Sequence, residues 1–113
     1  MEIKKYPQAI VIELIDRVDS TTSMEVENKL QELINGGAKN LICNCTPVRY
    51  ISSAGLRVIL STAKALKKNN GQLILCCPPT GYAYEVLETA GFTHIITVFK
   101  SEDEALQAVT ANV

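Results

Sequence analysis

Short strand-like runs alternate with amphipathic helical segments along the chain, and this alternation limits the fold more than any other feature of the sequence. Runs rich in apolar and β-branched residues predict strands at about 3–6, 9–15, 40–45, 72–77 and 95–99. Apolar residues at helical spacing predict helices at about 22–35, from the Ser52-Ser53 pair to Asn69, between Thr80 and Gly91, and from Ser101 through Val109. Such an order predicts parallel crossovers with helices packed on a sheet. We therefore expect an α/β fold with a mixed sheet of four to five strands, βα crossovers and about four helices.

Two of these helices carry a recognisable start signal. Thr22 with Glu25, and Ser101 with Glu104, have the spacing of a capping box, in which a hydroxyl and a carboxylate satisfy free backbone N–H groups. In the second helix, helical spacing predicts that the buried stripe consists of Leu56, Ile59, Leu60, Ala63 and Leu66.

The length and charge of the chain describe one ordinary globular domain. We expect its 113 residues to form a single domain, residues 1–113, with one core and no need for metal or disulfide staples. The formal net charge of -1 argues against a nucleic-acid binder, which normally has a basic excess. Lys64, Lys67 and Lys68 fall in the last turns of the second helix, where cations suit the helix dipole. No run is long enough to span a membrane or to form a signal peptide, so we expect a cytoplasmic protein.

The four cysteines form two close pairs, which raises the alternative of a metal or redox site. On a strand, Cys43 and Cys45 share one face, whereas Cys76 and Cys77 point to opposite faces. That arrangement cannot make a regular four-sulfur tetrahedron, and neither pair has the spacing of a zinc knuckle or a dithiol motif. We therefore expect reduced, buried thiols, no metal and no cofactor.

Catalytic constellations are missing from the sequence. His94 is the single histidine, and it has no cysteine or aspartate at a ligand or triad spacing. Ser53 has no histidine or lysine close in sequence to act as a base, and neither a phosphate-binding loop nor a dinucleotide fingerprint occurs. The sequence therefore favours a binding module over an enzyme.

The stretch from Tyr50 to Leu60 is the most informative part of the chain. It reads as a strand, a short turn and the first turn of a helix, with Ser52 or Ser53 near the N-cap. We expect Ser53 to be exposed there. A phosphate on Ser53 would be tolerated there, because free N–H groups and the positive end of the helix dipole lie beside it. Ala54 and Gly55 project almost no side chain, so we expect another protein to approach the backbone closely at this corner.

This stretch resembles the signature of the STAS domain, the family of sulphate transporters and anti-sigma factor antagonists. In the antagonists the usual form is Asp-Ser-x-Gly-Leu at a helix start, which places Ser53 on the phosphorylatable serine, Gly55 on the glycine and Leu56 on the leucine. Two positions depart from the pattern. Ser52 replaces the aspartate before the serine, and Asn44 replaces the aspartate near the end of the preceding strand, which removes charge that would orient the hydroxyl or the partner.

The resemblance implies a phospho-switchable anti-sigma factor antagonist with a STAS-like fold. Its unphosphorylated form would bind an anti-sigma factor, often a serine kinase, and so release a sigma factor; a phosphatase would reverse the phosphorylation. Ser53 would be the phosphoacceptor and Ser52 the second choice, in a protein that is a monomer or weak dimer. The residues expected to contact the partner are Ser52, Ser53, Ala54, Gly55 and Arg57.

Two other interpretations stay open at this point. The two serines can be a plain helix cap, since serine is favoured there without any function. Alternatively, the chain is a ligand-sensing or scaffold STAS domain that binds a nucleotide, lipid or small molecule at the same helix N-terminus without phosphorylation. Arg57, one turn after Ser53, would hydrogen-bond a phosphate or simply be an exposed helix arginine.

Overall fold

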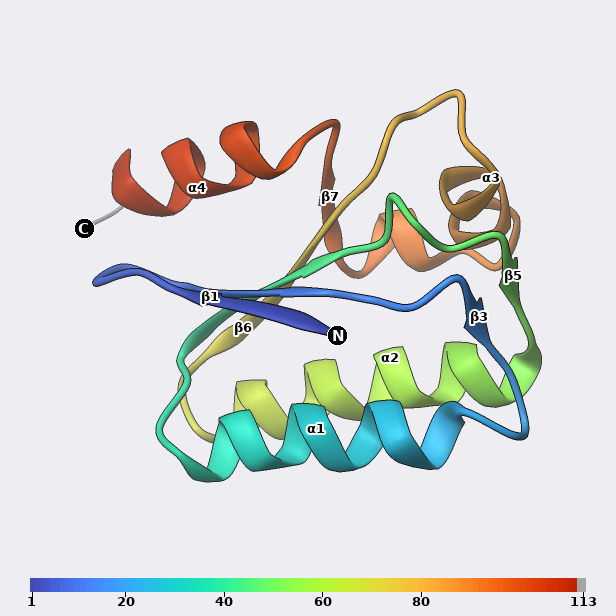
Figure 1. Cartoon of the computed structure of the whole chain (residues 1–113). Coiled ribbons are helices and arrows are strands. Elements are labelled where there is room, and N and C mark those ends of the chain that lie inside the picture. Colours follow the sequence, from blue (N-terminus) through green and yellow to red (C-terminus); the bar gives the residue numbers. More distant parts are fainter. Residues whose placement is uncertain (112–113) are drawn as a thin grey trace.

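The computed structural model describes residues 1–111, which form a five-stranded sheet with helices on both faces (Figure 1). In order across the sheet, the strands are β1 (Glu2–Lys5), β2 (Ile10–Glu13), β4 (Asn40–Asn44), β6 (Gln72–Cys76) and β7 (Thr97–Phe99). β1 is antiparallel to β2, and the remaining neighbours are parallel. The expected mixed α/β sheet is confirmed.

Four α-helices pack around this sheet, as the sequence predicts. α1 (Ser23–Asn35) and α2 (Ser53–Lys68) lie on one face, and α4 (Glu102–Ala111) lies on the other (Figure 1). α3 (Tyr82–Thr89) packs at one end of the molecule, against β5 (Tyr50–Ile51) and the short 3-10 helix η1 (Phe92–His94). Because η1 occupies the chain before β7, the last strand begins at Thr97 rather than at the predicted Ile95.

The core is divided in two by the sheet. β4 and β6 are covered on both faces, so alternate residues of each strand enter different clusters. The cluster beneath α1 and α2 includes Leu41, Cys43, Leu73 and Leu75, and the cluster beneath α4 includes Ile42, Ile74, Cys76, Ala105 and Val109. This explains why both strands are almost entirely apolar in sequence.

The buried face of α2 is rotated from the predicted stripe. Its buried residues are Gly55, Val58, Ile59, Thr62 and Leu66. Leu56, Leu60 and Ala63 are only half-buried, which corrects the prediction. Thr62 can face the core because its hydroxyl donates a 2.7 Å hydrogen bond to the Val58 carbonyl. An apolar pattern alone could not identify a face that includes a glycine and a threonine.

The start of α2 packs against a second, two-stranded sheet. This sheet pairs β3 (Arg17–Val18) with β5 in parallel. β5 falls at the strand that the sequence predicts at the start of the Tyr50–Leu60 stretch, whereas β3 was not predicted. The Ser52 N–H extends the pairing by donating to the Val18 carbonyl at 3.0 Å. Gly55 then packs on this sheet so closely that a Cβ atom there would lie 2.5 Å from the Val18 carbonyl oxygen and 2.8 Å from Ile51 Cγ1. Only glycine fits without a shift of the backbone.

We predict that Gly55→Ala lowers the free energy of unfolding by about 1–3 kcal/mol, because the added methyl group forces α2 away from β3. Urea denaturation followed by circular dichroism measures this change.

Gly36→Ala is the matched control for this substitution. Gly36 has φ -78°, and its nearest atom to an added Cβ is 3.4 Å away, so alanine fits there without strain. Equal denaturation midpoints for the two variants would contradict the tight contact at Gly55.

All four cysteines are buried, on the faces that strand geometry predicts. Cys43, Cys45 and Cys77 lie in the cluster beneath α1 and α2, whereas Cys76 lies in the cluster beneath α4. Burial raises the pKa of the Cys43 thiol to about 12. Burial, followed by the negative charge of Glu102, raises the pKa of Cys76 to about 12 as well. Very little thiolate is therefore available at neutral pH.

We predict that the folded protein resists alkylation by iodoacetamide at pH 8, since the reaction requires an accessible thiolate. In guanidinium chloride all four cysteines become reactive. Intact-mass spectrometry counts the added groups. Rapid labelling of a thiol under native conditions would show that a cysteine is accessible and available for chemistry.

Candidate functional site

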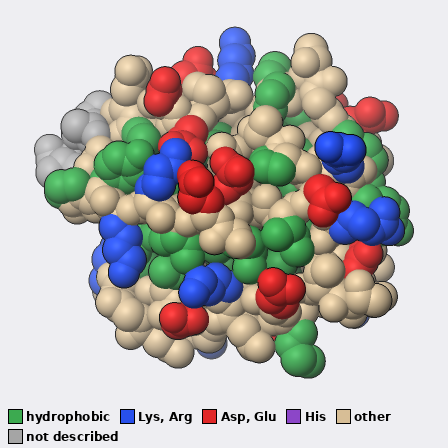
Figure 2. Space-filling view, viewed as in Figure 1, with side chains coloured by type: hydrophobic (Ala, Val, Ile, Leu, Met, Phe, Trp, Pro, Cys, Tyr) green, Lys and Arg blue, Asp and Glu red, His purple; other side chains and the backbone are tan. Residues whose placement is uncertain are grey.

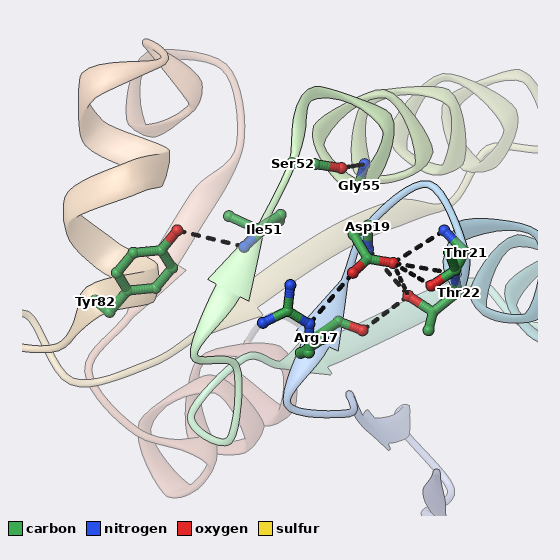
Figure 3. A network of polar contacts seen from close by, with 8 residues as sticks. All are labelled: Arg17, Asp19, Thr21, Thr22, Ile51, Ser52, Gly55 and Tyr82. Atoms are coloured by element: carbon green, nitrogen blue, oxygen red, sulfur yellow. Dashed lines mark hydrogen bonds and ion pairs between the residues drawn. The ribbon is translucent and has the colours of Figure 1, made fainter.

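The two serines at the start of α2 have different environments. Ser52 is the N-cap: it has extended backbone, it is half-buried, and its Oγ accepts a hydrogen bond from the Gly55 N–H at 3.4 Å. Ser53 is the first helical residue and is exposed. Within residues 1–111 its hydroxyl has no hydrogen-bond partner. Ser53 is thus presented to solvent on a tip that Ser52 holds in place, as Figure 3 shows for Ser52 and Gly55.

Gly55 does not lie where we expected it. Gly55 is buried. Val18 of the same chain occupies the space beside its Cα, so neither solvent nor a partner can approach the backbone there. The prediction that Gly55 offers open backbone to another protein is therefore wrong. Ala54 is half-buried and keeps part of its surface beside Ser53.

Arg57 lies on the same side of α2 as Ser53, since residues four apart share a helix face. It is exposed and lines a shallow groove between α1 and α2, together with Ser23, Glu27 and Ala54. Arg57 takes part in no ion pair with another described residue. Its guanidinium is therefore available to an anion at the helix tip.

Asp19 organises the loop that leads from β3 into α1, next to the tip of α2 (Figure 3). Its Oδ1 accepts hydrogen bonds from the Thr21 hydroxyl at 2.7 Å and from the Thr21 N–H at 2.9 Å. The hydroxyl and then the N–H of Thr21 lower the pKa of this carboxyl. Its Oδ2 accepts from Arg17 Nε at 3.3 Å. Asp19 is thus committed to holding the loop.

The capping box predicted at Thr22 and Glu25 is not formed. Thr22 is the N-cap of α1, but its side chain makes no cap hydrogen bond. Its hydroxyl instead donates to the Arg17 carbonyl at 2.8 Å and accepts from the Asp19 N–H at 3.0 Å. The Thr22 hydroxyl therefore bonds to the backbone of the loop and not, as the sequence spacing predicts, to the first turn of the helix. At α4 the predicted cap forms in part, with the Glu104 N–H donating to Ser101 Oγ at 3.2 Å.

Two exposed tyrosines near the tip were missed by sequence reasoning. Tyr50, in β5, is 41% exposed, and the Arg17 guanidinium lies over its ring at 4.6 Å from the centroid. Tyr82, the first residue of α3, is 40% exposed, and its hydroxyl accepts a hydrogen bond from the Ile51 N–H at 3.4 Å. Figure 3 shows its ring reaching from α3 toward β5. Both rings thus lie on the segments that flank the tip of α2, a placement that depends on the fold.

Asn44 belongs to a different polar cluster. Its Nδ2 donates to Glu102 Oε1 at 3.2 Å, and its Oδ1 accepts from the Thr46 N–H at 3.0 Å. Lys4 Nζ donates to the other oxygen of Glu102 at 2.7 Å. Figure 2 shows acidic and basic side chains interspersed on the face of the molecule that is turned to the viewer in Figure 1, where β1 lies in front.

These contacts explain the departure at residue 44 in local terms. Asn44 faces α4, on the opposite face of the sheet from α2, so its amide orients Glu102 and not the Ser53 hydroxyl. An aspartate at this position would set a second carboxylate against Glu102.

The arrangement at the α2 tip has the parts of a recognition surface. It combines a hydroxyl and an arginine that have no side-chain partner among the described residues with two partly exposed aromatic rings, and arginine and aromatic side chains are common at the centres of protein interfaces. His94 is exposed in η1. In the part of the chain that the structure covers, no three His, Cys, Asp or Glu residues lie together as a metal site would require. The helices described there are also too short or too polar to cross a membrane.

Comparison with known proteins places this geometry in a family. Residues 1–105 match the STAS domain. A Bordetella bronchiseptica protein that carries the name anti-sigma factor antagonist BtrV is 35% identical over 91 residues, which are 80% of this chain and 78% of that protein.

Solved structures share the fold at lower identity. The Bacillus protein SpoIIAA in its unphosphorylated form superposes with a TM-score of 0.81 at 22% identity, covering 99% of this chain and 97% of that one. An anti-sigma factor antagonist from Mycobacterium paratuberculosis gives a TM-score of 0.85 at 18% identity, with 96% and 92% coverage. Through its match along residues 1–105 and its 35% identity to a relative, the chain belongs to the STAS domain family.

Proposed function

We propose that this protein is an anti-sigma factor antagonist, and that the tip of α2 is the surface that binds the anti-sigma factor. The observation that carries the proposal is the exposed hydroxyl of Ser53, which has no hydrogen-bond partner among the described residues and lies at a helix start that Gly55 packs tightly against Val18. The name of its 35% identical relative supports the same function. The contact surface comprises Ser53, Ala54 and Arg57, with Tyr50 and Tyr82 as aromatic anchors beside them.

Phosphorylation of Ser53 would end the association through charge. The serine is neutral and can be buried against a partner, whereas phosphoserine carries a charge of about -1.5 to -2 at pH 7. Ser53 stands at the N-terminus of a 16-residue helix, where the dipole and free N–H groups accept negative charge. The added charge therefore leaves the fold intact and acts on the partner. SpoIIAA, which shares this fold, has been solved in both unphosphorylated and phosphorylated forms.

Ser53 is a better phosphoacceptor than Ser52. Ser52 is half-buried, and its oxygen already accepts from Gly55, so a kinase would have to break the cap to reach it. An anti-sigma factor that is itself a serine kinase would modify Ser53, and a phosphatase would restore the binding form. Arg57 would then hydrogen-bond the phosphate from one turn along the helix.

We predict that Ser53→Asp weakens binding to the anti-sigma factor by about tenfold or more, because an unpaired carboxylate must be desolvated in the contact. Ser53→Ala retains binding. The affinities are measured by isothermal titration calorimetry with anti-sigma factors captured on the immobilised wild-type protein. Circular dichroism and thermal unfolding establish that each variant is folded.

Ser101→Asp is the matched control, because it adds the same charge at the start of a different helix, α4, on the opposite face of the sheet. Aspartate also caps helices well, so this variant keeps its fold. Equal affinities for Ser53→Asp, Ser101→Asp and the wild type would show that the α2 tip is not the binding surface.

We also predict that the captured kinase and ATP place one phosphate on Ser53. Tandem mass spectrometry of the proteolysed protein locates the phosphate, and Ser53→Ala abolishes the modification. A phosphate found on Ser52 in the wild type would move the switch by one residue. No phosphate on either serine, with binding intact, would leave an antagonist without this switch.

A further inference from the structure

A second candidate surface lies beside the C-terminal half of α2, away from Ser53. It is an open groove of about 470 Å³, which we call the β7 groove, and its lining includes Leu60, Ala63, Leu73, Ile96, Lys64 and Lys67. Ile95 also lines it and is 64% exposed, which is high for a large apolar side chain. The proposed function does not use any of these residues.

The fold leaves this strip of the sheet uncovered for a structural reason. α3 has only eight residues and packs against η1 and β5, at the end of the molecule that holds β5 (Figure 1). It therefore does not extend along β7 beside α2. The side chains of Ile96 and Val98 face the α2 side of the sheet: Ile96 is a buried member of the core cluster there, and the half-buried Val98 packs against that cluster.

The strand that borders the groove is an unprotected edge. β7 is the last strand of the sheet, so no described strand pairs with its outer backbone groups. Its three residues, Thr97, Val98 and Phe99, carry no charge. The opposite edge, β1, carries Glu2, Lys4 and Lys5. Charged side chains are a common device against unwanted strand pairing, and β7 lacks them where β1 has them.

The rim of the groove is positively charged. Lys64 and Lys67 lie one turn apart on α2, and no aspartate or glutamate is among the lining residues. The ion pairs seen within residues 1–111 involve Lys4, Arg17 and Lys29 but neither of these two lysines. A complementary ligand is therefore acidic at its borders and apolar at its centre.

We propose that the β7 groove binds an extended segment of a partner protein, which adds to the sheet as a strand alongside β7. Edge strand addition supplies main-chain hydrogen bonds, and side chains at alternate positions supply specificity. Positions two apart on one strand face the same side. The segment would direct an apolar residue against Leu60 and Ile96, and acidic residues two positions before and after it toward Lys64 and Lys67.

This inference is tested with a synthetic heptapeptide, acetylated and amidated, of sequence Thr-Glu-Thr-Leu-Thr-Glu-Thr. The full chain, labelled with 15N, is titrated with the peptide and followed by NMR. We expect saturable shifts of the amides at 95–99 and around Lys64 and Lys67, with the amides of β1 unchanged. A matched peptide with lysine in place of both glutamates should bind about tenfold more weakly, because it opposes like charges.

Charge reversal in the protein provides the reciprocal test. The double substitution Lys64→Glu and Lys67→Glu should weaken binding of the acidic peptide about tenfold and should reverse the preference between the two peptides. Lys68→Glu is the control, since Lys68 is exposed on the same helix but outside the lining of the groove.

Several results would overturn the proposal. One is an absence of chemical-shift changes at peptide concentrations up to about 1 mM, which excludes binding tighter than that concentration. The others are shifts confined to other surfaces and equal binding of both peptides. Shifts at 95–99 that depend on protein concentration without peptide would assign the groove to a second copy of the chain instead. Since Ser53 plays no part in these measurements, their outcome is independent of the switch at the α2 tip.

Discussion

The contact between Gly55 and the carbonyl of Val18 decides where the start of α2 can lie. The two-residue strands β3 and β5 pair beside the main sheet, and the Ser52 N–H extends that pairing by one hydrogen bond. Gly55 brings the helix backbone onto this small sheet at a distance that no other residue type permits. The buried Gly55 therefore sets the position of the helix start, and with it the exposure of Ser53.

The packing of the α2 start on the small sheet gives neighbouring residues of the motif two different roles, one structural and one at the surface. Ser52 and Gly55 are structural, because one caps the helix and the other fits it against Val18. Ser53, between them, has a free side chain. A modification at Ser53 changes the charge of the surface while its neighbours keep the backbone in place. Around it, the loop held by Asp19 and the ring of Tyr82 brace the adjoining segments (Figure 3).

Local sequence patterns predicted most of the architecture. The apolar runs that became β4 and β6 are continuous because helices cover both faces, and glycines or prolines mark the chain reversals between elements. The exposure of Ser53 also followed from the pattern, since a small polar pair precedes the helical stripe. A two-residue strand has no detectable period, so β3 was not predicted, and without its pairing to β5 the burial of Gly55 could not be predicted either.

Other features could not be read from the chain because distant residues create them. The Asp19 carboxylate accepts the hydrogen bonds that hold the loop before α1, where the sequence spacing predicted a Thr22 cap. A hydrogen bond between residues 31 apart in sequence joins the Tyr82 hydroxyl to the Ile51 N–H. The rotated face of α2 depends on Thr62 returning its hydroxyl to the Val58 carbonyl. In each case a polar group could bond to several partners, and the one that it bonds to is the one that the folded chain brings close.

The polar cluster on the α4 face couples two positions that are 58 residues apart in sequence. Asn44 serves Glu102 as a donor and the Thr46 N–H as an acceptor, and its neutral amide does both where an ionised carboxylate could only accept. An ionised aspartate at position 44 could not donate to Glu102, and it would place a second negative charge beside a carboxylate that already pairs with Lys4. The residue types at positions 44 and 102 therefore constrain each other, and one acidic side chain suits the pair better than two.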